Sequence, residues 1–470
     1  MSEAAGETSS PQRGIASRAR SFARTAVPSR ADAAQLALLV LALAVYRFVP
    51  AVGWGIPVLL CATVFVRGIA GLPRGDRRWA GACALVAAVL FCGVLAVFGY
   101  HQPLVSDPRD FMDQSSALAG AWRGGWYPAI SLKGSPPYMG TLHTGYQRVL
   151  ALLFLVAGPG AGMAIALNGL CVVLLPAGVM LLARELWHGA AEAEGPRWPG
   201  GAHRMAALLA AAYPGFLFWG TWVLKDLLLA ALFVFAAWML LRALRRRTAL
   251  DWALFALSAA FCATVRAYAG LSLLLGLAAY GVALLPRRRV FMVLLYALLL
   301  ALLASYGVRF GVVWRQLWFS VLNLVPDGAT SSWTSLAAFA AGLPRLLLGP
   351  YAWVRAHAAP GFDTYYGLYP GMWVLYLLVY PLATAGLWFA ARRNHLPVVI
   401  PVVCVGAAWI LFLATYGGLA SRQRLYLEPL LMCLAGAGWM RCRRGRWIAA
   451  WAAGVILFAG GQLLSLSWGR

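Results

Sequence analysis

Acidic residues and lysine are scarce in this chain. Its 470 residues hold 15 Asp and Glu against 39 Lys and Arg, and the formal net charge is +24. Charged residues make up only 11% of the sequence and hydrophobic residues 62%, and the latter fall in runs of about 20 residues, the length of a bilayer-spanning helix. Long uncharged runs of this kind exclude an ordinary soluble domain. The sequence therefore predicts an all-α, polytopic transmembrane protein.

Several familiar motifs are missing as well. There is no phosphate-binding loop of the GxxxxGK[ST] type and no soluble nucleotide-binding domain, so any reaction must take its energy from an activated substrate or from outside the chain. The cysteines show no CxxC spacing and the histidines are scattered. The sequence identifies no cofactor with certainty, and it leaves a divalent metal open without giving support for one. The eight cysteines lie mainly in apolar runs and are expected to be buried thiols: Cys61, Cys83, Cys92, Cys171, Cys262, Cys404, Cys433 and Cys442.

The arginines lie in short clusters between the apolar runs. In a soluble chain such a charge would suggest nucleic acid, but clusters in short loops mark the cytoplasmic side of a membrane protein, and no nucleic-acid partner is expected. One topology of about thirteen spans puts all the clusters on that side, with the N-terminus inside. The predicted spans are 33–50, 52–71, 79–99, 161–183, 204–220, 222–242, 249–266, 268–285, 289–307, 370–391, 397–416, 425–440 and 447–467.

The chain divides into a tail and one large domain. Residues 1–32 are rich in Ser, Ala and Arg, and are expected to be a disordered basic cytoplasmic tail. Residues 33–470 form a single integral-membrane domain with large outer loops at 100–160 and 308–369. Segment 147–158 is apolar but too short to cross, so the first loop is expected to contain interfacial helices. The second loop is rich in Trp and Tyr, which suit an interface and also sugar stacking.

The first outer loop carries the most informative acids. Asp107, Asp110 and Asp113 lie within seven residues of one another, where carboxylates are costly at a membrane surface without a partner or a task. A carboxylate there can deprotonate an acceptor hydroxyl. The alternative interpretation, a solvated loop or a helix cap, stays open.

Cations and polar groups predicted for the same outer face form a short set. They are suited to holding a phosphate group. Lys133 and Lys225 are the only two lysines, which suggests that a compact ammonium matters at those positions. Interfacial ion pairing, snorkelling or an ordinary loop position is the alternative for each. Together with Asp113 of the first outer loop, the predicted substrate-binding set comprises Lys133, Lys225, Asp226, Arg266, Tyr268, Arg422 and Arg424.

Five stretches together resemble bacterial membrane glycosyltransferases of the GT-C superfamily, near glycosyltransferase family 39 (dolichyl-phosphate-mannose-protein mannosyltransferase-like). The likeness covers roughly 100–285 and 370–440. The stretches are Asp107 with Phe111, Asn168 followed by Arg184-Glu185-Leu186, Tyr213 to Trp219 followed by Lys225-Asp226-Leu227, Arg266-Ala267-Tyr268, and Arg422-Gln423-Arg424 before Pro429.

The resemblance implies a GT-C-like fold and an enzyme that takes a sugar from a polyprenyl-phosphate donor. Its catalytic base would be Asp107, with Asp110 as second choice, and its acceptor a glycan, lipid or protein. It would lie in the bacterial plasma (inner) membrane among membrane lipids, with an extracytoplasmic active site. Two alternatives remain: a polysaccharide polymerase or ligase that uses a polyprenyl-diphosphate oligosaccharide, and a lipid-linked sugar flippase. The absence of an internal repeat and of charges in the middle of the spans disfavours the flippase.

Overall fold

The computed structural model describes residues 50–99, 106–124, 144–188, 201–285, 365–416 and 424–441. These residues form helices, and no β-strand occurs among them, which confirms the all-α prediction for this part of the chain. The predicted tail 1–32 and the predicted spans 289–307 and 447–467 lie outside the described residues, as does most of 33–50 and of the loop 308–369.

Most predicted spans in the described ranges coincide with helices. Each helix begins and ends within a few residues of an apolar run, because polar or Gly and Pro residues flank these runs. The helices are α3 (Pro50–Ala70), α4 (Arg74–Phe98), α7 (Ala161–Leu186), α11 (Asp226–Arg246), α12 (Ala249–Val265), α13 (Ala267–Ala283), α17 (Tyr365–Arg392), α18 (Val399–Tyr416) and α19 (Glu428–Arg441), with a short 3-10 turn η2 (Leu396–Val398) before α18.

The predicted span 204–220 is interrupted. It forms α9 (Ala202–Ala211) and α10 (Pro214–Gly220), with Ala212 and Tyr213 between them. Proline has no amide hydrogen and restricts the residue before it to extended conformations, so a helix ends here and a new one starts at Pro214. The described part of the predicted first outer loop contains two helices, α5 (Ser106–Arg123) and α6 (Gly145–Ala157), and α6 coincides with the apolar segment that was expected to be an interfacial helix.

Three of the described helices are long and apolar enough to cross a membrane, judged by length and composition alone. They are Arg74–Val97 in α4, Ala161–Leu186 in α7 and Asp226–Arg246 in α11. Shorter apolar segments lie in α3, α6, α12, α13 and η2–α18. The chain thus has the apolar helices of a membrane protein, while the total of about thirteen spans stays a prediction.

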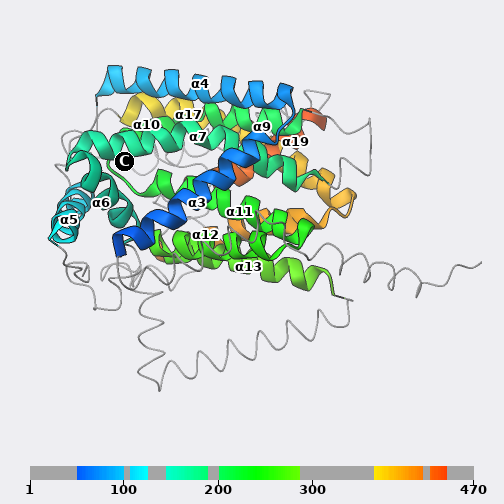
Figure 1. Ribbon diagram of the computed structural model, residues 1–470. Coiled ribbons are helices and arrows are strands. Elements are labelled where there is room, and N and C mark those ends of the chain that lie inside the picture. The colour runs from blue at the N-terminus through cyan, green and yellow to red at the C-terminus, as the bar shows by residue number, and fades with distance from the viewer. Residues whose placement is uncertain are drawn as a thin grey trace, which may run out of the picture.

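Helix α11 forms the centre of the bundle and α4 one outer side. Side chains on all sides of α11 are buried, where it packs against α7 and α12. Helix α4 lies along α7, α9 and α10 (Figure 1) and turns large apolar side chains outward, for example Leu85 at 65% and Val97 at 74% exposure. An exposed apolar face of this kind suits contact with lipid.

Glycines let α19 pack closely against its neighbours. A methyl group at Gly438 would overlap the carbonyl of Leu382 in α17, and one at Gly436 would overlap the carbonyl of Ala202 in α9. Small residues at such positions allow helix backbones to approach, which is the common way to pack helices in a membrane.

The described arginine clusters meet at one end of the bundle, here called the arginine end. Asp76, at the start of α4, contacts Arg204 at 2.8 Å, His203 at 3.2 Å and Arg184 at 3.9 Å. Glu185 pairs with Arg245 at the end of α11. The ends of α17 and α19 lie here too, since Arg441 covers the Phe389 ring at 4.4 Å and His395 stacks on Trp187 at 5.3 Å. That this end faces the cytoplasm stays a prediction.

Candidate functional site

A tight turn between α10 and α11 presents Lys225 and Asp226. The buried Asn168 of α7 holds this turn, because its side-chain amide donates a hydrogen bond of 2.6 Å to the carbonyl of Trp222. The predicted span 222–242 starts inside this turn, and that bound is wrong: residues 221–224 form the turn and α11 begins at Asp226. Asp226 therefore lies in the first turn of a helix, where a carboxylate interacts favourably with the helix dipole.

Arg266 connects two helices to Asp226. It sits between α12 and α13 in extended backbone conformation, with φ −152° and ψ 117°. Its guanidinium donates a hydrogen bond of 2.7 Å to Oδ1 of Asp226 and another to the hydroxyl of Tyr268. Both charged side chains are buried, at 7% and 3% exposure. Charge-assisted hydrogen bonds between buried groups are strong and fix the geometry of both partners.

Two buried oxygens, one in this pair and one near it, have no hydrogen-bond partner within the described ranges. One is Oδ2 of Asp226 and the other is the hydroxyl of Tyr146, at the start of α6. Burial raises the pKa of Tyr146, and the negative charge of Asp226 adds to this effect, so the phenol is neutral and can donate. Buried polar atoms are normally satisfied, and the two oxygens mark a place where a polar group of a ligand can bind.

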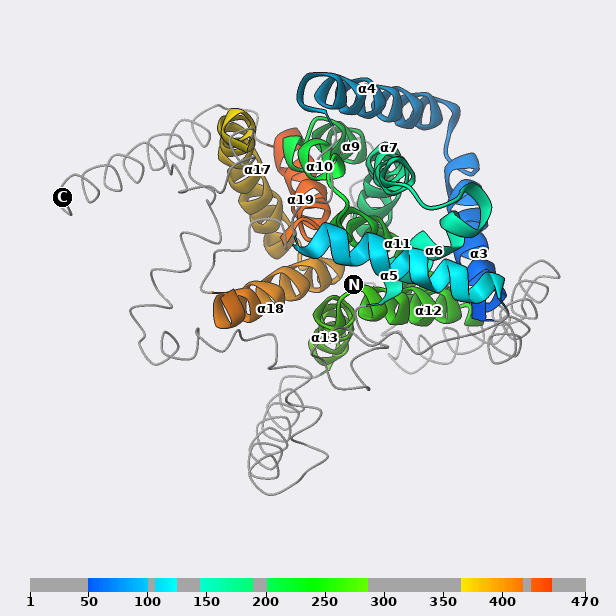
Figure 2. The ribbon, with the colours of Figure 1, turned by 90° about the vertical axis from the view of Figure 1, so that its left-hand side faces the viewer.

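Lys225 ties the first outer loop to this pair. Its ammonium lies 5.5 Å from the centre of the Phe111 ring in α5, and Phe111 packs edge-on against Tyr146 at 5.4 Å. Figure 2 shows α5 lying across this end of the bundle, where α7 is seen nearly end-on. Asp107 is in the first turn of α5, four residues before Phe111, and this spacing puts two helical positions on one face.

The other two acids of α5 are not brought into this group. Asp110 and Asp113 are exposed. Asp113 pairs with Arg109 at 3.7 Å, with 71% and 72% of their side chains exposed. This is the solvated-helix alternative for these two positions. Lys133 and Arg422 lie outside the described residues, and their predicted roles stay predictions.

A second buried ion pair lies next to the first. Nε of Arg424 is 3.2 Å from Oε1 of Glu428, with the side chains 2% and 1% exposed. Tyr426 lies between Arg424 and Glu428 in the sequence, and its ring centre is 6.1 Å from that of Tyr268. Because Tyr268 accepts a hydrogen bond from Arg266, the two ion pairs belong to one polar region. We call this region the Asp226 end; its members are Lys225, Asp226, Arg266, Tyr268, Arg424, Tyr426 and Glu428, with Tyr146 and Phe111 at its edge.

Sequence reasoning missed three members of this region: Tyr146, Tyr426 and Glu428. A signal existed for one of them, because Glu428 is the only acid after Asp363, and an isolated acid in apolar sequence is a candidate functional residue. No such signal marked the two tyrosines, which look like ordinary interfacial residues.

The arrangement offers a hydrogen-bonded carboxylate, a lysine and two paired arginines, with the first turn of α5 close by. Across the ranges that the structure describes, no three His, Cys, Asp or Glu side chains are grouped as metal ligands would be. Comparison with protein-family models, with curated proteins and with solved structures finds no match. What this site does must therefore be argued from its own chemistry.

Proposed function

We propose that the protein is a membrane-embedded glycosyltransferase of the GT-C kind, which transfers a sugar from a polyprenyl-phosphate donor to an acceptor outside the cytoplasm. One observation carries the proposal: the contact of Phe111 with Lys225 brings the acid-bearing helix α5 beside the buried pair of Asp226 and Arg266. Three motifs that are up to about 160 residues apart in the sequence thus meet in one place.

The chemistry requires a base on one side and cations on the other. Asp107 takes the proton of the acceptor hydroxyl, the acceptor oxygen forms a bond to the anomeric carbon, and the bond from that carbon to the phosphate oxygen breaks. The phosphate leaves with the negative charge. Lys225 is half-buried and can hold this charge as a compact cation.

The geometry changes the role proposed for Arg266. Its guanidinium already donates to Asp226 and Tyr268, so it is a positioning residue that fixes the carboxylate beside Lys225. Arg424 forms a buried ion pair with Glu428 and is proposed to be a positioning residue too. Oδ2 of Asp226, which has no hydrogen-bond partner among the described residues, is then available to accept a hydrogen bond from a sugar hydroxyl.

The proposal includes the membrane architecture expected from the sequence. It has about thirteen spans, a plasma-membrane location, the arginine end in the cytoplasm and the Asp226 end outside. Support comes from the three long apolar helices, from the exposed apolar face of α4 and from the gathering of arginines at the end opposite α5.

The test is sugar transfer by purified protein in proteoliposomes that contain a polyprenyl-phosphate sugar. Asp107→Asn should lower the rate by about 100-fold or more, because a general base contributes roughly 10²–10⁴. Asp110→Asn is the matched control on the same helix, and should keep most of the activity because its side chain is exposed. Full activity in both single variants and in the double variant would refute the assignment of the base.

Two further arms separate the alternatives. Transfer from a polyprenyl-diphosphate oligosaccharide, but not from the monophosphate donor, would mean a polymerase or ligase. Movement of the lipid-linked sugar across the membrane without transfer would mean a transporter.

Lys225→Ala should raise the donor KM about tenfold, since a charge-assisted contact of about 1.5 kcal/mol is lost.

A further inference from the structure

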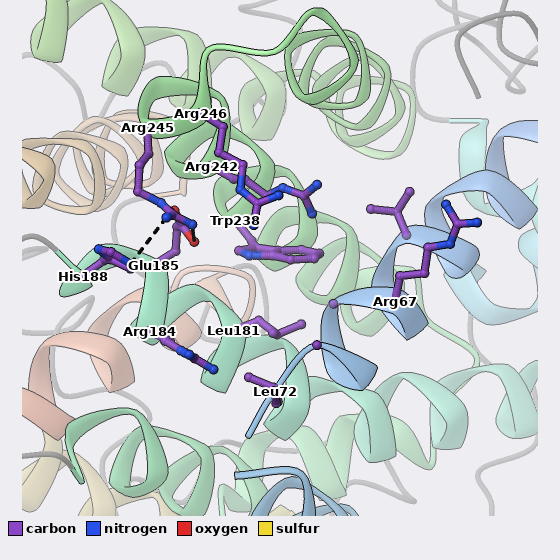
Figure 3. A pocket seen from close by; sticks show the side chains of 13 residues that line it. Arg67, Leu72, Leu181, Arg184, Glu185, His188, Trp238, Arg242, Arg245 and Arg246 are labelled. Atoms are coloured by element: carbon purple, nitrogen blue, oxygen red, sulfur yellow. Dashed lines mark hydrogen bonds and ion pairs between the residues drawn. The ribbon is translucent and has the colours of Figure 1, made fainter. Parts of the chain in front are cut away.

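A cavity of about 440 Å³ opens at the arginine end between α3, α7 and α11, far along the bundle from the Asp226 end. Figure 3 shows the lining side chains, with Arg242, Arg245 and Arg246 above the indole of Trp238 and Arg67 apart from them on α3. Five arginines and one acid line it, together with a histidine. They are Arg67, Arg184, Arg242, Arg245, Arg246, Glu185 and His188.

Two of the five arginines have no carboxylate partner within the described ranges. Arg245 is paired with Glu185, while Arg184 and Arg242 reach carboxylates outside the cavity, Asp76 at 3.9 Å and Asp251 at 2.9 Å. The remaining two, Arg67 of α3 and Arg246 of α11, are exposed and form no ion pair with a described residue. Counted over the described residues, the cavity therefore keeps an excess of positive charge that an anion can neutralise.

An apolar groove of about 260 Å³ follows the same three helices away from the cavity. On each helix the groove residues precede the cavity residues by about one turn. Ala62 and Phe65 of the groove precede Arg67 of the cavity on α3, and Gly178 precedes Leu181 on α7. On α11, Val234 and Phe235 precede Trp238. One turn of a helix is about 5.4 Å, so groove and cavity adjoin.

Glycines let side chains of the neighbouring helices pack closely beside the groove and the cavity. A Cβ at Gly178 would meet Val234 at 3.0 Å and Phe65 at 3.5 Å, and one at Gly68 would meet the Trp238 ring at 2.5 Å. Leu174, on the rim of the groove, is 37% exposed, so the groove opens sideways toward the surroundings of the bundle. A chain molecule can enter from that side without passing through the core.

We propose that cavity and groove together bind one anionic glycerophospholipid, with its phosphate among the arginines and an acyl chain in the groove. The charge of the cavity complements a phosphate diester, which guanidinium groups bind with paired hydrogen bonds. The groove offers no polar partner to a second charged group, and it fits an aliphatic chain. A free phosphate ion leaves the groove unexplained, and a neutral lipid leaves the arginine excess unexplained.

Native mass spectrometry of the purified protein tests this in detergent with equal amounts of phosphatidylglycerol and phosphatidylcholine. Wild type should retain one phosphatidylglycerol in preference to phosphatidylcholine, and Arg67→Gln with Arg246→Gln should lower that preference about tenfold. The matched control is Arg77→Gln with Arg78→Gln, which removes the same charge at the start of α4, outside the cavity. This control should change the preference less than about twofold.

The groove is tested separately. Ala62→Trp or Leu174→Trp should fill it and release phosphatidylglycerol, and sn-glycerol 3-phosphate, which has the headgroup without the chains, should not displace the lipid from wild type. Two variants are named so that one that fails to fold does not end the test. Equal losses in both arginine pairs, unchanged retention in the filled groove, or displacement by sn-glycerol 3-phosphate would overturn the proposal. Preferential retention of a polyprenyl phosphate over phosphatidylglycerol would overturn the choice of lipid.

Discussion

The two ends of the bundle use charge in opposite ways. At the Asp226 end, Arg266 and Asp226 are sealed from solvent and so are Arg424 and Glu428. At the arginine end, cations outnumber acids, and Arg67 and Arg246 are exposed on the wall of an open cavity. The first arrangement fixes side chains in one geometry. The second leaves a surface that attracts anions.

The two ends differ in the free energy that their charges cost on folding. A buried pair is expensive to desolvate, and removing one partner leaves the other buried without compensation. An exposed pair contributes little to stability, because water and salt screen it. A costly pair needs a reason for its presence, and at the Asp226 end that reason is the proposed site. The exposed arginines at the other end are not desolvated, so their presence carries no such cost.

The largest expected effect concerns the sealed pair. Asp226→Leu leaves the guanidinium of Arg266 buried without its carboxylate, and should destabilise the folded protein by roughly 3–5 kcal/mol. Thermal or denaturant unfolding in detergent measures this. The double variant Asp226→Leu with Arg266→Met should recover most of the loss, since a buried ion pair can often be replaced by apolar groups. A small effect of the single change would mean that water reaches the pair.

The sequence predicted much of this fold and only part of the site. Apolar runs located α7, α12 and α13 closely, because span length and flanking residues determine where such helices begin and end. The break at Pro214 follows from backbone chemistry. In contrast, the partner of Asp226 is Arg266, 40 residues later, and no local pattern shows which of several nearby cations a carboxylate will bind.

The same limit applies to the first outer loop. Three clustered acids drew attention to α5, yet Asp110 and Asp113 point to solvent and the residue that touches Lys225 is the apolar Phe111. Counting charges located this segment but did not predict that it is a helix. Only the packing of α5 across the bundle shows which face of it is inside.

An intermediate effect is expected where the arginine end does bury an acid. Asp76 has 8% of its side chain exposed and contacts Arg184, His203 and Arg204. Asp76→Asn removes the charge that holds the starts of α4 and α9 to the end of α7. It should destabilise by about 1.5–3 kcal/mol, the range for hydrogen bonds to charged groups, measured by the same unfolding experiment.

The control for Asp76 lies at the opposite end. Asp113→Asn breaks an exposed pair with Arg109 on α5 and should change stability by at most about 0.5 kcal/mol. Comparing the two variants shows whether the loss of stability depends on burial of the carboxylate or on the end of the bundle where it lies. If Asp113→Asn cost as much as Asp76→Asn, the contrast between sealed and open charge would be wrong.

The smallest effect is a pH dependence at the arginine end. His395 stacks on Trp187 and its Nε2 is 2.6 Å from the carbonyl of Leu186. Burial lowers the pKa of His395, and the contact with this carbonyl only partly opposes it. Burial also lowers the pKa of His203, and Asp76 partly opposes this. At a pH between the lowered pKa of these histidines in the folded protein and their ordinary pKa near 6.5, the unfolded chain binds more protons than the folded one.

Stability should therefore fall as the pH drops below about 6.5, and be fully present above it. Unfolding temperatures from pH 8 to pH 5 measure the slope. His395→Phe keeps an aromatic ring against Trp187 but cannot titrate, so its profile should be flatter, with the remainder belonging to His203. An unchanged slope in this variant would mean that His395 takes up its proton equally in both states, and that water reaches the contact between His395 and Trp187.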